Sequence, residues 1–183
     1  AESGLKIQFN PTQARERLRF SIAHEIAHTL FPDVAEESRH RGATGKGDDW
    51  QLEMLCNLAA AEFIMPLGSL PFGESVPPIE VLMTHRRNFD VSAEAFLLRA
   101  AKVTADPMLV FCASPQQEDG VGAYRVDYVV ASPSCSSKAH SGVSLSAESP
   151  IGECTAVGHT ARGTIHWPGL GSLLLLYHAG LRL

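Results

Sequence analysis

The sequence predicts an α+β protein, with a mainly helical part over residues 1–105 and a β-rich part over 106–183. In the first part, apolar residues recur at the three- and four-residue spacing of helices. In the second, they form short or alternating runs bounded by turn-forming residues. The 183 residues suffice for one ordinary domain, or for a small domain with an appendage. Because 45% are hydrophobic and 19% charged, a packed core is expected.

The first elements are a short strand and a helix. Residues 5–9, LKIQF, alternate between apolar and polar side chains and are typical of a strand. Residues 12–31 carry the spacing of an amphipathic helix, which Pro32 ends. The stretch 33–49 is polar and rich in glycine, and a loop is expected there.

Three further helices are predicted before the β-rich part. One is capped by Asp48 or Asp49 and closed by Pro66. Two more, 78–87 and 92–103, are separated by the tight turn NFDV, so that they resemble a helix-turn-helix over about residues 77–104. A DNA-reading helix needs base-contacting polar residues at its start, and the second of these helices opens with little positive charge. We therefore expect a packing unit.

The remainder is predicted to be strands and loops. Residues 107–114 and 123–132 are typical of strands, joined by the polar turn 115–120. The serine-rich stretch 132–149 is expected to be loop, and 161–183 to form two further strands. No residue after 106 carries chemistry that the sequence identifies, so this region has no predicted role.

Charge and cysteine content exclude several classes of protein. The net charge is −5 and no basic face is sustained, which argues against bulk attraction to nucleic acid or to an anionic membrane. The four cysteines are far apart and form no Cys-x-x-Cys pair, as expected of reduced thiols. The apolar run 172–177 is too short to cross a bilayer, and no signal peptide is recognisable. A cytoplasmic protein without membrane contact is expected.

The segment RLRFSIAHEIAHTLF contains a His-Glu-x-x-His motif at His24, Glu25 and His28. Residues four apart project from the same helix face, so both imidazoles can bind one metal ion. Zinc suits such ligands, and catalytic zinc keeps a position for water. Glu25 lies about 100° around the helix from His24, where it can act as a general base on that water. The alternative is a helix with two surface or capped histidines.

A third ligand can come from the second long helix, which carries Glu53 and Glu62. A glutamate from a second helix is the usual third ligand of one class of zinc peptidase. Glu53 shares a face with Asn57, and Glu62 is near that side. Because its neighbours are apolar, Glu62 is expected to be partly buried. The spacing leaves both glutamates open.

Two motifs resemble those of the ImmA/IrrE family of metallopeptidases over residues 5–105. That family shows an Arg-Phe-x-x-Ala-His-Glu-x-x-His helix followed by a Glu-x-x-x-Asn-x-x-Ala-Ala-x-x-x-Met-Pro helix. The matching residues are Arg19, Phe20, Ala23, His24, Glu25 and His28, then Glu53, Asn57, Ala60, Ala61, Met65 and Pro66. Ala27 stands where the family often has glycine. Alanine is a better helix former, so the motif remains intact.

The resemblance implies a zincin-like, gluzincin-type zinc peptidase unit that includes the helix-turn-helix-like pair. By position it implies His24, His28 and Glu53 as zinc ligands and Glu25 as the catalytic residue, with Glu62 in a supporting role. It also implies a cytoplasmic regulatory protease that cleaves a specific protein, typically a helix-turn-helix transcriptional repressor, in a stress or mobile-element response. No direct binding to nucleic acid is expected.

Two other readings remain open on the sequence. The first is a non-catalytic, metal-stabilised module that sequesters a regulator or senses metal. The second is a DNA-binding regulator built on residues 78–103. A hydrolase also needs a group that stabilises the oxyanion. The candidates are His40, His85, Arg86 and Arg87, each more typical of a surface position.

Overall fold

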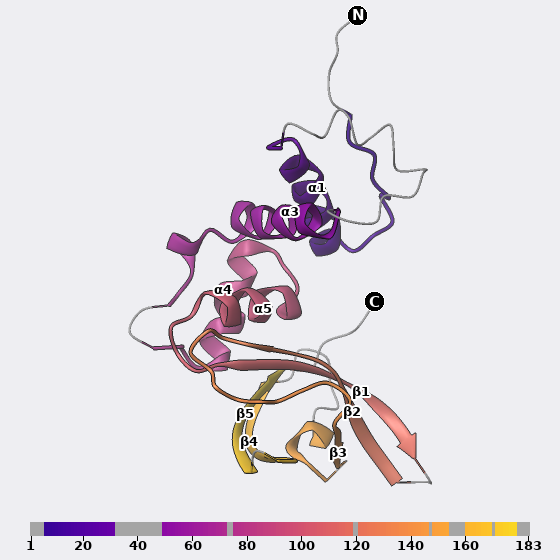
Figure 1. Ribbon diagram of the computed structural model, residues 1–183, viewed down its shortest axis with the longest axis vertical. Helices are drawn as coiled ribbons and strands as arrows, with labels where there is room; N and C mark the ends of the chain where they lie inside the picture. Colours follow the sequence, from indigo (N-terminus) through magenta and orange to yellow (C-terminus); the bar gives the residue numbers. More distant parts are fainter. Residues whose placement is uncertain are drawn as a thin grey trace, which may run out of the picture. The chain divides into compact units, whose positions relative to one another are not determined.

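The computed structural model describes residues 6–31, 49–72, 75–118, 121–146, 148–153, 160–169 and 171–178. These residues form α-helices and antiparallel strands, which confirms the α+β class (Figure 1). The chain groups into two compact units. The first comprises Ala1–Leu70 with Phe89–Ser92, and the second comprises Pro71–Asn88 with Ala93–Leu183. The loop predicted for 33–49 falls almost wholly outside the described residues.

The first unit contains helices α1 (Arg15–His28) and α3 (Asp49–Ile64) and the short 3₁₀ turn η1 (Leu67–Ser69). Both predicted helices are confirmed, with α1 shorter at each end than predicted. The strand predicted over 5–9 is wrong, because residues 6–10 have no regular secondary structure. Alternation alone does not make a strand. A strand needs a partner, and none of the described segments pairs with this one.

Helices α1 and α3 contact each other through small side chains. Ala23 and Ala27 of α1 are buried, as are Cys56 and Ala60 of α3. The distance between two packed helices depends on the side chains at their contact, and alanine allows a close approach. Ala27 is fully buried, so the position that is often glycine in the family here also carries a small side chain at the helix contact.

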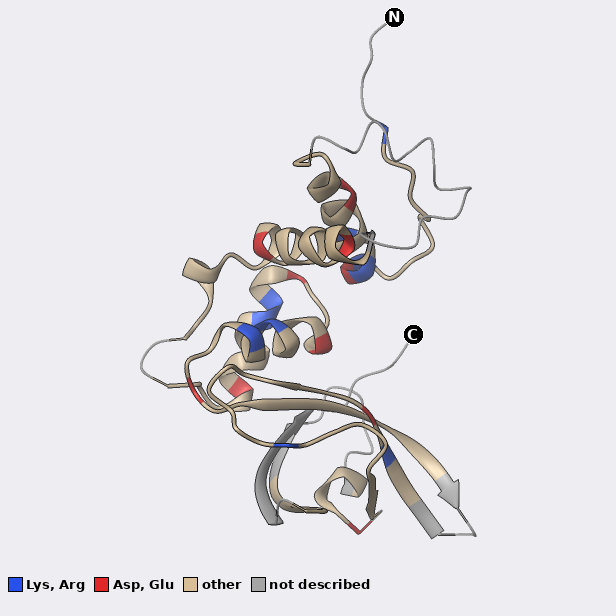
Figure 2. Ribbon diagram, in the orientation of Figure 1, with Lys and Arg blue, Asp and Glu red and all other residues tan. Residues whose placement is uncertain are grey.

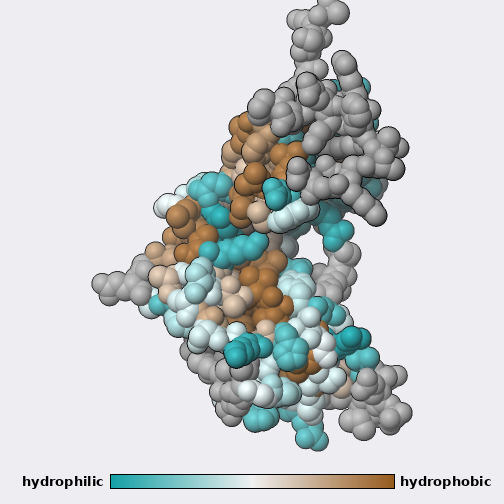
Figure 3. Space-filling model, in the orientation of Figure 1, coloured by the Kyte–Doolittle hydropathy of each residue, from teal (hydrophilic) through white to brown (hydrophobic). Residues whose placement is uncertain are grey.

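Helix α3 also exposes an apolar face. Figure 3 shows apolar surface over this helix. The exposed large apolar side chains of α3 are Trp50, Met54, Leu55, Leu58 and Phe63. Met54 directly follows Glu53 in the chain, and Leu58 directly follows Asn57. The apolar face therefore lies beside the face that carries those two polar residues.

The second unit opens with helices α4 (Ile79–Phe89) and α5 (Ala93–Val103), as the sequence predicts. The buried face of α5 is formed by Phe96, Ala100 and Ala101, and this helix contacts strands β1 and β2. The Tyr128 hydroxyl of β2 donates a hydrogen bond to Glu94, in the first turn of α5. The Glu94 side chain, at the start of α5, therefore makes a contact within its own unit.

Strands β1 (Leu109–Glu118), β2 (Val121–Ala131) and β3 (Ser144–Ser146) form an antiparallel sheet in that order (Figure 1). The turn predicted over 115–120 is too long, since β1 and β2 stay paired up to Glu118 and Val121. A hairpin ladder joins backbone groups and so continues through polar residues. The loop predicted over 132–149 likewise contains β3, which pairs with β2.

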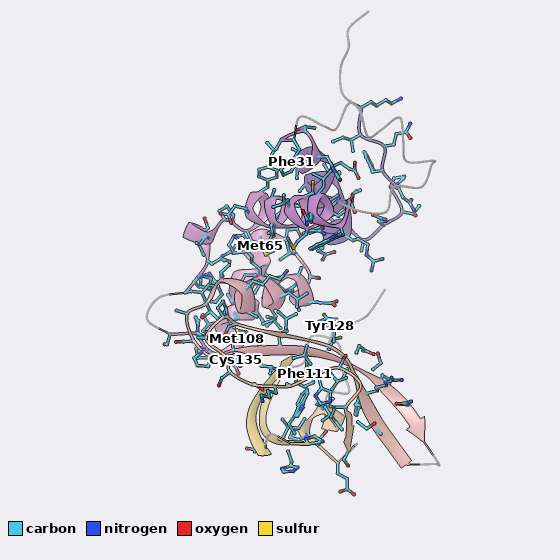
Figure 4. The ribbon with its side chains drawn as sticks, in the orientation of Figure 1. Phe31, Met65, Met108, Phe111, Tyr128 and Cys135 are labelled. Atoms are coloured by element: carbon cyan, nitrogen blue, oxygen red, sulfur yellow. The ribbon has the colours of Figure 1, made fainter. Side chains whose placement is uncertain are left out.

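Strands β4 (Thr160–Trp167) and β5 (Gly171–His178) form a second antiparallel pair, as predicted, and the 3₁₀ turn η2 (Pro150–Glu153) packs against β4. The core of this unit joins the two sheets. The ring of Phe111, which Figure 4 labels, meets that of Trp167 edge to face with centroids 5.1 Å apart. Val126, Leu145 and Ile165 are buried around them. No helix within the described ranges is long and apolar enough to cross a membrane.

Candidate metal centre

Helix α1 places His24 and His28 one turn apart on its contact face with α3. Their Nε2 atoms lie 3.2 Å apart, and the rings meet edge to face with centroids 4.8 Å apart. The His28 side chain is only 7% exposed and that of His24 is 16% exposed. Both imidazoles therefore present Nε2 to the same small volume.

Glu53 of α3 brings its carboxylate to the same point. Its Oε2 lies 3.0 Å from Nε2 of His24, and its Oε1 lies 3.5 Å from Nε2 of His28. Zinc bonds of 2.0–2.1 Å in a tetrahedral arrangement separate neighbouring donor atoms by about 3.3 Å. The observed separations of 3.0–3.5 Å match that value, so the three side chains fit a tetrahedral metal ion. Within the described part of the chain, this is the cluster of three such donors that could hold one.

Glu62, the other candidate for a third ligand, lies elsewhere. Its Oε1 accepts a hydrogen bond from the backbone N–H of Leu67 at 3.0 Å, where the chain leaves α3. The expectation that Glu62 is partly buried is wrong, since its side chain is exposed. The structure thus brings Glu53, and not Glu62, to the two histidines.

Glu25 is exposed on α1 and lines an open pocket of ≈ 150 Å³. The other walls of this pocket are residues 7–10, which precede the helix, together with Gln13 and Ser21. Among the residues that the structure describes, the Glu25 side chain takes part in no ion pair or hydrogen bond. Its carboxylate is therefore available to accept a proton.

Asn57 has a contact that the sequence did not reveal. Its Oδ1 lies 3.0 Å from Nδ1 of His24, on the side of the ring opposite Nε2. The sequence signal was the four-residue spacing from Glu53, which puts both side chains on one face of α3. That spacing showed that the two residues are neighbours, but not which ring nitrogen Asn57 would meet.

Arg19, also part of the first motif, secures the segment Phe89–Ser92. Its Nη1 donates hydrogen bonds to the backbone oxygens of Phe89 (2.6 Å) and Asp90 (3.3 Å). Arg15 and Arg19 both pair with the Asp90 carboxylate, at 2.7 and 3.3 Å. Asp90 has φ = 54°, a left-handed conformation that aspartate tolerates better than most residues.

The remaining sequence candidates do not join this cluster. Cys56 is fully buried in the α1–α3 contact as a small apolar group. His85, Arg86 and Arg87 lie in α4, in the second unit, and His40 lies outside the described residues. The oxyanion-stabilising role considered for them stays a prediction.

Comparison with known proteins decides the family. The sequence profile of the IrrE N-terminal-like domain matches residues 5–101, which span both motifs and all of the residues above that surround the two histidines. The chain belongs to the ImmA/IrrE family of metallopeptidases. The resemblance inferred from the two motifs is confirmed.

Two curated relatives within this family are similar to the chain. It is 34% identical over 156 residues to the radiation response metalloprotease IrrE of Deinococcus deserti, a match that covers 79% of this chain and 53% of that protein. It is 29% identical over 116 residues to the radiation response metalloprotease IrrE of Deinococcus radiodurans, over 60% of this chain and 34% of that protein. The chain thus spans about half or less of the length of these relatives.

Proposed function

We propose that this protein is a zinc-dependent endopeptidase of the gluzincin type, in which His24, His28 and Glu53 hold the metal. The convergence of their donor atoms, at separations of 3.0–3.5 Å, carries the proposal. Membership in a metallopeptidase family supports it. The zincin-like peptidase unit would span residues 1–105 and include the helix-turn-helix-like pair, with 106–183 as an extension.

Zinc is the proposed ion because two neutral imidazoles and one carboxylate form a common catalytic zinc ligand set. When bound, zinc would act as a Lewis acid, which polarises the scissile carbonyl and lowers the pKa of a coordinated water. The same ligands suit other divalent ions, so the choice of zinc is part of the proposal.

Glu25 is the proposed general base. Its uncommitted carboxylate would take a proton from the water as the water oxygen attacks the peptide carbonyl carbon. It would then deliver this proton to the amine nitrogen as the peptide bond breaks. Glu25 lines an open pocket together with residues 7–10, so its carboxylate is accessible from solvent.

The proposed substrate is a specific cytoplasmic protein, such as a helix-turn-helix transcriptional repressor whose cleavage would switch on a stress response. The family resemblance supports this substrate class, and the names of the Deinococcus relatives, radiation response metalloproteases, support a role in a stress response.

The deciding experiment incubates the zinc-loaded chain with a panel of helix-turn-helix repressors from the same genome and follows cleavage by mass spectrometry. Glu25→Gln should abolish cleavage without changing zinc content, whereas the matched α1 variant Glu16→Gln should cleave normally. If no repressor is cut but another protein is, the substrate class is wrong and the peptidase proposal stands.

A non-catalytic module that sequesters a regulator predicts a different pattern. The wild-type chain would then bind a repressor without cutting it, and Glu25→Gln would bind equally well and keep any effect on repressor activity. That result would replace the peptidase with the binding or sensing module.

A further inference from the structure

We propose that Asn57 is a positioning residue, which fixes the ring orientation and the tautomer of His24 so that Nε2 faces the metal. The proposal rests on the metal site of the proposed function. Its observation is the 3.0 Å contact between Asn57 Oδ1 and His24 Nδ1. This contact lies on the side of the imidazole ring away from His28 and Glu53.

The contact selects one tautomer because the amide oxygen of Asn57 can only accept a hydrogen bond. His24 must therefore carry a proton on Nδ1. In the neutral ring, Nε2 then carries no proton and offers its lone pair, as a metal ligand must. Without an acceptor at Nδ1, nothing in the described surroundings of that nitrogen favours this tautomer.

The tautomer also changes the meaning of the contact between His24 and Glu53. An imidazole protonated only on Nδ1 has no N–H to donate to Oε2 of Glu53, 3.0 Å from Nε2. Two acceptor atoms at that distance repel each other unless a cation lies between them. By fixing this tautomer, the Asn57 hydrogen bond makes His24 Nε2 and the Glu53 carboxylate two acceptors that favour a metal ion between them.

His28 is held by other means, which makes the role of Asn57 specific to His24. The His28 side chain is 7% exposed, so that packing restricts its ring. His24 is more accessible and lies nearer to the exposed carboxylate of Glu53, where packing contributes less. A hydrogen bond to the far nitrogen of a ligand histidine is the usual way to orient such a ring, and its loss typically weakens metal binding by about 10–100-fold.

Helix α3 supplies the ligand and the orienting residue from one face. Glu53 and Asn57 are four residues apart, so their side chains project from the same side of the helix, toward His24. The spacing between the carboxylate and the amide is therefore set by the helix itself. A change in the position of α3 moves both contacts to His24 together.

The test measures the zinc dissociation constant of the purified chain by competition with a chromophoric chelator. Asn57→Ala and the similarly shaped Asn57→Leu both lack the acceptor and should bind zinc about 10–100-fold more weakly than wild type. Asn57→Asp keeps an acceptor at that place and should bind within about threefold of wild type, or more tightly. Gln51→Ala removes another exposed amide from the same helix and should leave the affinity unchanged.

A second readout separates positioning from a general effect on folding. Long-range ¹⁵N–¹H NMR of the zinc-loaded protein should show a His24 Nδ1–H that exchanges slowly with water in wild type and Asn57→Asp, and faster in Asn57→Ala. The thermal midpoints of metal-free Asn57→Ala and Gln51→Ala should be similar, because both residues are exposed.

Zinc affinity and His24 Nδ1–H exchange that stay unchanged in Asn57→Ala and Asn57→Leu would overturn this inference and leave the proposed metal site intact. If the wild-type chain binds no zinc, the metal site fails and the inference fails with it. Equal weakening by Asn57→Asp and Asn57→Ala would also overturn it, since an acceptor would then make no difference.

Discussion

Nε2 of His24 and Oε2 of Glu53 lie 3.0 Å apart, although the two residues belong to different helices. The small side chains between α1 and α3 allow this approach, because each helix buries alanines where they meet. The carboxylate thereby reaches both histidines, and the geometry of the cluster depends on the packing of two helices.

The first prediction concerns the ligand set. Metal content of the purified chain, measured by mass spectrometry after incubation with zinc, should be about one zinc per chain. His24→Ala and Glu53→Ala should each lose it, because each removes one of three donors. Glu62→Ala should keep it, since Glu62 accepts the Leu67 N–H instead. Zinc retained by Glu53→Ala and lost from Glu62→Ala would reverse the assignment.

The second prediction concerns Arg19 and the segment Phe89–Ser92. Arg19→Ala removes donors to two backbone oxygens and one partner of the Asp90 carboxylate. It should lower the free energy of unfolding by about 1–2 kcal/mol, a value reduced by the partial exposure of the side chain.

Hydrogen exchange supplies the local measurement for this variant. The amides of Phe89–Ser92 should exchange faster in Arg19→Ala than in wild type, and in the control Arg87→Ala they should not. Arg87 is an exposed arginine at the end of α4. Unchanged protection of the segment in Arg19→Ala would show that these hydrogen bonds do not hold it.

The third prediction concerns Gly163 of β4. A Cβ at this position would lie 2.6 Å from Cγ and 2.7 Å from Cβ of Pro150, closer than side chains approach. The proline ring is rigid, so Gly163→Ala should destabilise the protein by about 1–3 kcal/mol in urea unfolding. Gly68→Ala is the control, because nothing lies within 4 Å of the added Cβ there. Equal stability of the two variants would contradict the packing of η2 against β4.

The fourth prediction concerns nucleic acid. Titration of duplex DNA at low salt, followed by fluorescence anisotropy, should be flat. The net charge is −5, the first turn of α5 offers Glu94 bonded to Tyr128, and Arg99 of α5 is only 8% exposed. Basic and acidic residues both occur on α4 and α5 (Figure 2), so these two helices do not form a uniformly basic face. Saturable binding that weakens steeply with salt would revive the DNA-binding alternative.

Much of the fold was predictable because it depends on local patterns. The helical spacing around His24 and around Cys56, and the alternation in the β-rich part, predicted α1, α3 and most strands. The errors arose where the outcome depends on a distant partner. Within the described part of the chain, no strand pairs with residues 6–10, whereas β1 and β2 extend through polar residues because each supplies the other's hydrogen bonds.

By itself, the sequence predicted which residues could bind a metal ion. The spacing of His24 and His28 on one helix puts their rings on the same face, whatever surrounds them. Helix spacing left both Glu53 and Glu62 open, since both lie near one side of a single helix, and the family resemblance implied Glu53. The packing of α3 on α1 brings Glu53, and not Glu62, to the histidines, and it also places Asn57 at the far nitrogen of His24. Helix periodicity defines a face of each helix, but the approach of two helices selects the atoms that meet.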